Sequence, residues 1–369
     1  MASIRKRDLA TGGVAYLVRF RGPDGKERSR QFKRKRDAEN YANSIEVDRA
    51  QGTVIDPRLG RITVTEWFER WWPTVTDLRP TTYARDEQYF RTHVLPVFGN
   101  VPLARLDRTD LRQFVADLSA PKDAGGSGLA PATVQKVIQV FNKVMRSAEE
   151  DRLISHNPVD GLPLPRVERE EMRFVTADEL WRLADTIDPR YRSFVLLAGY
   201  GGLRLGELLG LRWSRVNLLR REVEVAETLI ELKGHFTSGP PKTRAAVRTV
   251  SVPGFVCDEL ALLATAHGDR NSLVFQSPDG YPIRASLFRR RFWTPAVKAA
   301  GLAPLRIHDL RHSAVSLWIA AGANPKQVAV RAGHTSVSVV FDRYGHLYPK
   351  HDDDLITALE ARRPASAQR

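Results

Sequence analysis

Two histidines and an arginine stand close together in LRIHDLRHS, residues 305–313. His308 and His312 are four residues apart, a spacing that puts two imidazoles on one helical face, where zinc could bind. A zinc hydrolase of that type needs a Glu beside the first histidine, but Asp309 stands there, and the cation Arg311 would repel a metal. His308 and Arg311, three residues apart, suit an anionic phosphate instead. We therefore interpret the segment as part of a phosphate site.

A second arginine occurs in GGLRLGE, residues 201–207. Arg204 follows two glycines that allow close backbone approach, and Glu207 is placed to hold it. When a phosphodiester is cleaved, negative charge gathers on its non-bridging oxygens, and one guanidinium can bind two of them. The one dense acidic cluster, residues 352–354, consists of adjacent carboxylates that point in different directions on a helix. It predicts a solvated helix start rather than the two-metal site of a nuclease.

A candidate nucleophile lies in RAGHTSVSVVFDRYGHLYP, residues 331–349. Tyr344 follows His334 by ten residues. A phenol with a pKa of about 10 attacks poorly at neutral pH, so a base or a positive field must help to remove its proton. His308 or His334 can move protons at that pH. Tyr348 is a rival nucleophile, but it precedes a proline and is interpreted as a packing residue.

In their order and spacing these motifs resemble those of the tyrosine site-specific recombinases, the phage-integrase family. The matching segments are GLRLGELLGLRW, PPKTRAAVRTVSVP, HDLRHSAVS, AGH and DRYGHLYP. The resemblance implies that Tyr344 attacks the scissile phosphate and forms a 3′-phosphotyrosyl link, leaving a free 5′-hydroxyl. It implies that four residues bind the phosphate and aid proton transfer: Arg204, His308, Arg311 and His334. Lys242 in PPKTRA would protonate the leaving oxygen, with Lys233 as the alternative. Neither metal, cofactor nor ATP is expected.

Three modules are predicted to position these residues. In residues 1–56, two alternating runs flank a Pro-Asp-Gly turn and precede a helix, which predicts a β-hairpin with one helix. Residues 62–160 contain four amphipathic helix candidates, the first opened by a Thr63–Glu66 capping box. A Pro-rich linker separates them from residues 172–369, which read as mostly helical with a small antiparallel sheet. By resemblance these are an arm-type DNA-binding domain, an all-α core-binding domain and a catalytic domain with the tyrosine recombinase fold.

The formal net charge of +14 and a pI near 10.1 favour a nucleic-acid partner, with a merely basic surface as the alternative. Basic residues exceed acidic ones in the first and last modules, whereas residues 61–165 are balanced. The cations of the middle module, Arg91 and Arg146 included, must therefore share a face if that module clamps DNA. The predicted DNA contacts are Arg19, Arg28, Arg30, Arg85, Lys136 and Lys143.

The resemblance implies double-stranded DNA attachment sites as substrate and a tetramer on DNA, with an excision factor or DNA-bending protein as possible partners. A C-terminal helix from residue 352 onward is expected to dock on a neighbouring protomer. The lone Cys257 excludes an internal disulfide framework, and no apolar run reaches the roughly 18 residues of a membrane span, so we expect a cytoplasmic protein. The alternatives are a recombinase that resolves chromosomes or plasmids and a DNA-binding regulator without catalysis.

Overall fold

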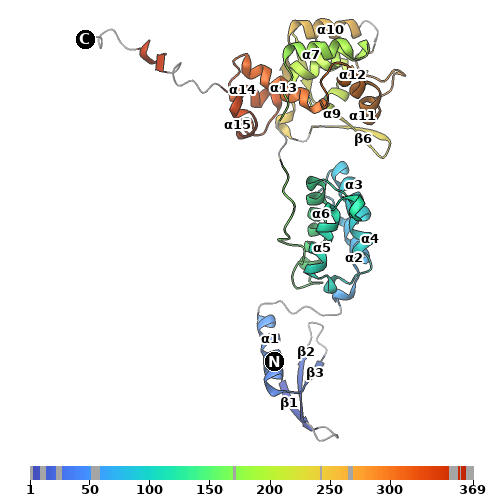
Figure 1. Ribbon diagram of the computed structural model, residues 1–369, viewed down its shortest axis with the longest axis vertical. Coiled ribbons are helices and arrows are strands. Elements are labelled where there is room, and N and C mark those ends of the chain that lie inside the picture. The colour runs from blue at the N-terminus through green and yellow to red at the C-terminus, as the bar shows by residue number, and fades with distance from the viewer. Residues whose placement is uncertain are drawn as a thin grey trace, which may run out of the picture. The chain divides into compact units, whose positions relative to one another are not determined.

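The computed structural model describes residues 3–8, 14–21, 27–50, 59–168, 172–241, 243–264, 269–348, 356–357 and 359–362 (Figure 1). The chain divides into two compact units, residues 1–169 and 170–369. Within the first unit, the N-terminal sheet and the helical bundle have separate hydrophobic clusters. The finer domain boundaries, 1–56, 62–160 and 172–369, stay a prediction.

The first unit begins with a three-stranded antiparallel sheet in the order β1 (Ser3–Asp8), β2 (Val14–Arg21) and β3 (Glu27–Phe32). Helix α1 (Lys35–Ala50) lies beside this sheet, and Val18 is buried against Ala38 and Ala42 (Figure 1). The predicted hairpin and helix are confirmed. The prediction lacked β1 because its sequence, SIRKRD, is fully exposed and shows no apolar alternation.

The rest of the first unit is a helical bundle. Its helices are α2 (Val64–Trp71), α3 (Pro80–Tyr89), the π-helical η3 (Phe90–Val94), α4 (Leu95–Phe98), α5 (Arg108–Ser119) and α6 (Pro131–Glu150). Single 3₁₀ turns connect them: η1 (Leu59–Arg61), η2 (Trp72–Thr74), η4 (Leu103–Arg105) and η5 (Lys122–Ala124). The capping box of Thr63 and Glu66 opens α2 as predicted. Because α3, η3 and α4 run on without a break, the four predicted helical stretches are confirmed.

The second unit is mostly helical. Its α-helices are α7 (Ala177–Thr186), α8 (Arg192–Gly201), α9 (Leu205–Leu209), α10 (Gly254–Ala264), α11 (Ala285–Phe288), α12 (Thr294–Ala299), α13 (Ile307–Ala320), α14 (Pro325–Ala332) and α15 (Ser338–Tyr344). Shorter turns are η6 (Pro189–Tyr191), η7 (Trp213–Arg215), η8 (Arg244–Ala246), the π-helical η9 (Arg289–Trp293) and η10 (Gly345–Leu347). Helix α8 is buried on nearly every side and packs on α7, α10 and α13, so it is the centre of this core.

Two small antiparallel sheets complete the second unit. One has the order β4 (Val216–Asn217), β5 (Glu222–Val225) and β8 (Arg248–Ser251); the other is the hairpin β6 (Thr228–Leu232) and β7 (His235–Gly239). This confirms the predicted class of a mainly helical domain with a small antiparallel sheet. Of the C-terminal stretch from residue 352, only residues 356–357 and 359–362 are described. No helix in the described ranges is both long and apolar enough to cross a membrane.

Candidate active site

Arg204 stands at the start of α9, where its backbone leaves the loop after α8. Its backbone N–H donates to Glu207 Oε2 at 2.8 Å, and its Nη1 donates to Glu207 Oε1 at 2.8 Å. Its Nη2 donates to the carbonyl of Gly333 at 3.2 Å, beyond the end of α14. The Arg204 side chain is 38% exposed, so part of its guanidinium is open to a ligand. Its hydrogen bonds to Glu207 and to the Gly333 carbonyl fix its orientation.

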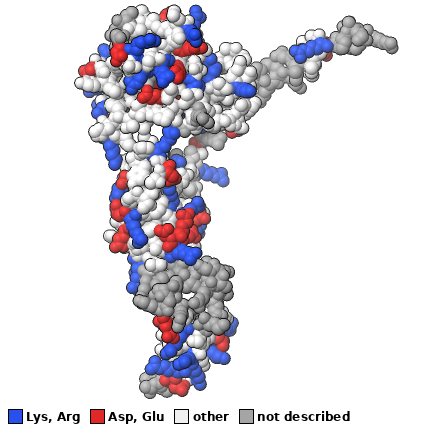
Figure 2. Space-filling model, turned by 180° about the vertical axis from the view of Figure 1, so that it is seen from behind, with Lys and Arg blue, Asp and Glu red and all other residues white. Residues whose placement is uncertain are grey.

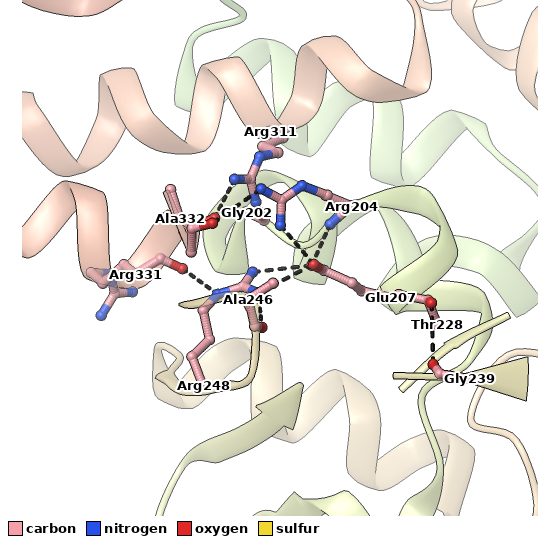
Figure 3. A network of polar contacts seen from close by, with 11 residues as sticks. Gly202, Arg204, Glu207, Thr228, Gly239, Ala246, Arg248, Arg311, Arg331 and Ala332 are labelled. Carbon is pink, nitrogen blue, oxygen red and sulfur yellow. Dashed lines mark hydrogen bonds and ion pairs between the residues drawn. The ribbon is translucent and has the colours of Figure 1, made fainter. Parts of the chain in front are cut away.

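Glu207 is almost fully buried and is shared by a second arginine (Figure 3). Arg248 Nη1 and Nη2 donate to the two carboxylate oxygens of Glu207 at 3.2 and 3.1 Å. Arg248 also donates to the carbonyls of Arg331 and Ala246, at 2.6 and 2.9 Å. Burial alone would raise the pKa of Glu207, but the hydrogen bonds and charges of Arg248 and Arg204 outweigh it and lower that pKa. Glu207 is therefore a fixed anion between two cations.

Arg311 lies on the first turns of α13 and is buried. Its guanidinium donates to the carbonyl of Gly202 at 2.5 Å and to the carbonyl of Ala332, so it joins the end of α8 to the end of α14 (Figure 3). Burial, with the charges of Arg204 and Arg248, lowers the pKa of Arg311 to about 9, which leaves it protonated at neutral pH. We call Arg204, Arg248 and Arg311 the arginine cluster.

In the arginine cluster, Arg204 and Arg248 pair with the carboxylate of Glu207, and Arg311 lies close enough for the three charges to act on it. Burial lowers the pKa of Arg311 most, and repulsion by the charges of Arg204 and Arg248 lowers it further. An anion that binds beside Arg204 and Arg311 would relieve that repulsion and accept hydrogen bonds from their remaining N–H groups. The cluster is thus built for a phosphate or another oxyanion.

Tyr344 ends α15 and is 1% exposed. Its hydroxyl lies 2.6 Å from Nδ1 of His312, which is also buried. Burial, and the charge of neighbouring His308, lower the pKa of His312 to about 4, so this imidazole is neutral at pH 7. The phenol is neutral too, because burial raises the pKa of Tyr344 more than Arg311 lowers it. In the tautomer of His312 that carries its proton on Nε2, Nδ1 accepts a hydrogen bond from the Tyr344 hydroxyl.

Of the two histidines predicted to move protons, His308 lies against His312, and His334 lies within reach of the charges of Arg311 and Arg204. The His308 ring meets His312 edge-on, with 4.9 Å between ring centroids, and partial desolvation followed by the charge of Arg311 lowers the pKa of His308. His334 follows Gly333, and burial with the charges of Arg311 and Arg204 lowers its pKa to about 4. Its Nδ1 is buried without a hydrogen-bond partner among the described residues. His334 is therefore neutral and has a polar atom available to a ligand.

The described part of the chain brings five predicted site residues into one region: Arg204, His308, Arg311, His334 and Tyr344. Lys242 lies outside the described residues. Tyr348, the rival nucleophile, has a buried hydroxyl without a partner in the described ranges. These ranges also contain no group of three His, Cys, Asp or Glu side chains that could hold a metal ion.

Two residues of the site were missed from the sequence. Arg248 stands in the alternating run VRTVSVP, where its position matches that of buried Val250, so the alternation itself marks it as inward-facing. His312 was considered only as a zinc ligand. Its place one helical turn after His308 is the signal that both rings share a face with the site.

The predicted DNA contacts of the N-terminal sheet do not share a face. Arg30 pairs across the sheet with Val18 and lies over Tyr41 of α1 at 4.9 Å, so it is on the helix side. Arg28 has the same strand parity, but its side chain lies outside what is described. Arg19 is on the opposite, open face, where β1 adds Arg5 and Arg7.

The predicted contacts of the helical bundle are surface residues with polar partners. Arg85 donates to Asp86 at 2.5 Å, Lys143 lies 3.9 Å from Asp77, and Lys136 donates to Gln139. Arg91 pairs with Glu69 and Glu87, and Arg146 is exposed. On the face seen in Figure 2, basic and acidic side chains intermingle over this part of the molecule.

Comparison with known proteins places the chain in a family. Residues 173–351 match the model of the phage integrase family, and residues 63–119 match a phage integrase N-terminal SAM-like domain. The ICEBs1 integrase of Bacillus subtilis is 27% identical over 77% of this chain and 78% of its own length. A prophage phiRv2 integrase of Mycobacterium tuberculosis is 26% identical over 93% of this chain and 92% of its own.

Solved structures show the same fold. The Tn1549 transposon integrase in complex with a circular intermediate DNA matches with a TM-score of 0.66 at 19% identity, over 81% of this chain and 99% of that one. A lambda integrase tetramer bound to a Holliday junction matches with a TM-score of 0.60 at 18% identity, over 91% and 94%. The fold, the two family matches and the long alignments agree with the motifs of the site. The chain belongs to the phage integrase family of tyrosine recombinases.

Proposed function

We propose that the protein is a site-specific DNA recombinase that cleaves and rejoins duplex DNA through a 3′-phosphotyrosyl bond to Tyr344. The observation that carries this proposal is the arginine cluster, in which Arg204 and Arg248 share the carboxylate of Glu207. Its third member, Arg311, lies on α13 with His308 and with His312, which contacts the buried Tyr344. Such a site offers charge for a phosphate, a nucleophile for its phosphorus and imidazoles for proton transfer.

Each residue of the site has a distinct role in the proposed reaction. Arg204 and Arg311 bind non-bridging oxygens of the scissile phosphate, and Arg248 keeps Glu207 and the end of α14 in place. His308 and His334 add hydrogen bonds to the phosphate. The Tyr344 oxygen attacks phosphorus while the bond to the 5′-oxygen breaks, and that oxygen takes a proton from Lys242 or from water. The new ester retains the bond energy, so rejoining consumes no ATP.

Integrases of a conjugative element, prophages and a transposon are among the similar proteins. We therefore propose that the reaction integrates or excises a mobile element, in the cytoplasm at the host nucleoid. A tetramer on two attachment sites is the proposed working assembly, as for the lambda integrase tetramer on a Holliday junction. An excision factor or DNA-bending protein is the proposed partner that sets whether the element is integrated or excised.

DNA contacts outside the site follow from the surface charges. The open face of the N-terminal sheet presents Arg5, Arg7 and Arg19, and we propose that this face, rather than the helix side with Arg30, meets DNA phosphates. In the helical bundle, Lys136, Lys143 and Arg146 follow one face of α6 at helical spacing.

The second candidate is a recombinase that resolves chromosomes or plasmids. A relative described as tyrosine recombinase XerC-like is 22% identical over 76% of this chain. The two candidates differ in the N-terminal sheet: in an integrase it would bind DNA repeats that lie outside the core site. Recombination that needs those repeats and residues 1–56 supports the integrase, and recombination on a core site alone supports the resolving enzyme.

Covalent capture tests the proposal and selects the target sequence in the same experiment. A random-sequence duplex pool with a nick is incubated with the protein in EDTA, and DNA that survives a denaturing wash on the protein is amplified and selected again. The expected result is a single enriched core sequence with wild type and none with Tyr344→Phe. Enrichment that survives only native washes would contradict catalysis and favour a DNA-binding regulator.

A further inference from the structure

The hydrogen bond between Tyr344 and His312 has no part in the roles assigned above. It joins the last residue of α15 to the middle of α13, and both side chains are buried. At 2.6 Å the contact is within normal hydrogen-bond range, and neutral His312 with its proton on Nε2 presents the lone pair of Nδ1 to the phenol. This atom is a proton acceptor in contact with the attacking oxygen.

The other two histidines are less well placed for that task. In the described structure, neither His308 nor His334 is hydrogen-bonded to Tyr344. His308 is exposed, and its ring lies against that of His312. The Nδ1 of His334 is buried without a hydrogen-bond partner among the described residues. Geometry is the first requirement for a general base, and His312 meets it.

We infer that His312 is the catalytic residue that takes the proton of Tyr344 during cleavage and returns it during rejoining. This inference rests on the proposed function. In cleavage, the Oη–H proton moves to Nδ1, the oxygen forms its bond to phosphorus, and the bond from phosphorus to the 5′-oxygen breaks. In rejoining, a 5′-hydroxyl attacks phosphorus and gives its proton to Lys242 or to water, the bond from phosphorus to the Tyr344 oxygen breaks, and the protonated His312 returns its proton to the departing phenolate.

The surroundings make this base depend on DNA. The charged or titratable groups that act on His312 are His308, Asp309 and Arg311 on its own helix and Arg343 on α15. Burial and these cations hold His312 neutral in the free protein. A phosphodiester bound at Arg204 and Arg311 brings negative charge, offsets the cations and makes protonation of His312 easier. Proton removal by His312 and attack by Tyr344 are therefore coupled to DNA binding.

The test measures single-turnover cleavage of the captured, nicked core duplex from pH 6 to 9. His312→Asn keeps an amide oxygen near the position of Nδ1 but does not accept a proton. We expect it to slow adduct formation by about 100-fold at neutral pH, since general base catalysis contributes about 10²–10⁴-fold. The remaining rate should rise in proportion to hydroxide, and the rejoining rate should fall by a similar factor. The matched control is His156→Asn, which replaces an exposed histidine of the first unit and should leave both rates unchanged.

A second variant separates proton transfer from mere support of the fold. His312→Ala removes the ring, and added imidazole should restore part of the cleavage rate in proportion to its free-base concentration. A His312→Asn rate within about threefold of wild type would overturn the inference. So would a slow variant with the pH profile of wild type and no response of His312→Ala to imidazole. If wild type itself forms no adduct, the proposed function fails instead.

Discussion

At the residue scale, the site is held by one buried carboxylate. Glu207 fixes Arg204 through two hydrogen bonds and Arg248 through two more, and the exposed fractions of the Glu207 and Arg248 side chains are 1% and 4%. Such a pair is costly to break, because removal of one partner leaves an uncompensated buried charge. The carboxylate of Glu207 that stabilises the fold therefore also orients Arg204 for the proposed phosphate.

Glu207→Gln removes that anion without changing the size of the side chain. We expect the variant to lose about 3 kcal/mol of unfolding free energy, measured by chemical denaturation, since Arg248 stays buried and loses its counter-charge. The matched control is Glu231→Gln, whose ion pair with Arg284 at 2.7 Å is partly exposed. It should cost less than about 1 kcal/mol. Equal losses in the two variants would contradict the structural role of Glu207.

The buried histidines make stability depend on pH. His312 and His334 have pKa values of about 4 in the folded protein, below the ordinary value of about 6.5 that applies to the unfolded chain. Their contribution to stability is complete above pH 6.5 and is lost as the pH falls toward 4, because the unfolded chain then binds more protons. Between pH 7 and 5, His312 alone should account for a loss on the order of 2 kcal/mol.

Denaturation of wild type and His312→Asn at both pH values checks this expectation. Asparagine does not titrate, so the difference between the two pH values should shrink in the variant. An identical pH dependence in both proteins would show that His312 is not held neutral by the fold.

At the element scale, helix ends build the site. The end of α8 supplies the Gly202 carbonyl to Arg311, the end of α14 supplies the Gly333 carbonyl to Arg204, and the start of α9 carries Arg204 itself. Gly202 and Gly333 both have positive φ, at 66° and 61°, and so end their helices in the left-handed conformation that favours glycine. Two helix stops thus fix two arginines.

Gly202→Ala should damage both the helix stop and the packing behind it. A Cβ there would lie 2.6 Å from the Trp318 ring, whereas a Cβ on Gly322, with φ of 87°, would meet nothing within 4 Å. We expect Gly322→Ala to cost about 1 kcal/mol and Gly202→Ala about 2–4 kcal/mol, because only the latter adds a clash to the left-handed backbone. Thermal unfolding of the two variants measures this difference. Equal decreases in Tm would contradict a clash of the new Cβ with Trp318.

Local pattern was enough to predict much of this architecture. The alternation before and after Pro-Asp-Gly predicts β2 and β3, and the capping box of Thr63 and Glu66 predicts the start of α2. The family motifs gave five residues that the fold brings together. Arg248 and His312 escaped because their roles depend on partners from distant segments, Glu207 and Tyr344, which periodicity does not pair. The basic residues that share the open face of the N-terminal sheet could not be predicted either, because they depend on the register of β1 with β2, and β1 has no apolar alternation.

At the scale of the whole molecule, charge is distributed unevenly. A net charge of +14 serves DNA binding, yet several cations of the helical bundle already pair with carboxylates. The open sheet face carries Arg5, Arg7 and Arg19, of which Arg19 lies 3.8 Å from Glu27 in a largely exposed pair. Exposed pairs of this kind are weak and exchange readily for phosphate.

Replacing Arg5, Arg7 and Arg19 together by Ala should therefore weaken DNA binding without touching cleavage chemistry. The slope of log affinity against log salt should become shallower by about 3, one for each lost phosphate contact. Arg30→Ala, on the helix side of the sheet, should change it by less than about one. Fluorescence anisotropy with a long duplex measures both. A larger effect of Arg30 would assign DNA to the other face.

The central claim is that Tyr344 becomes covalently linked to a 3′-phosphate, and mass spectrometry of the trapped adduct tests it most directly. Digestion after Arg343 and Lys350 releases residues 344–350, which hold both Tyr344 and Tyr348, so fragment ions must decide between them. We predict a nucleotide on Tyr344 and a free 5′-hydroxyl on the other DNA end, open to labelling by polynucleotide kinase. A nucleotide on Tyr348, or a 5′-phosphate at the cleaved end, would contradict the account.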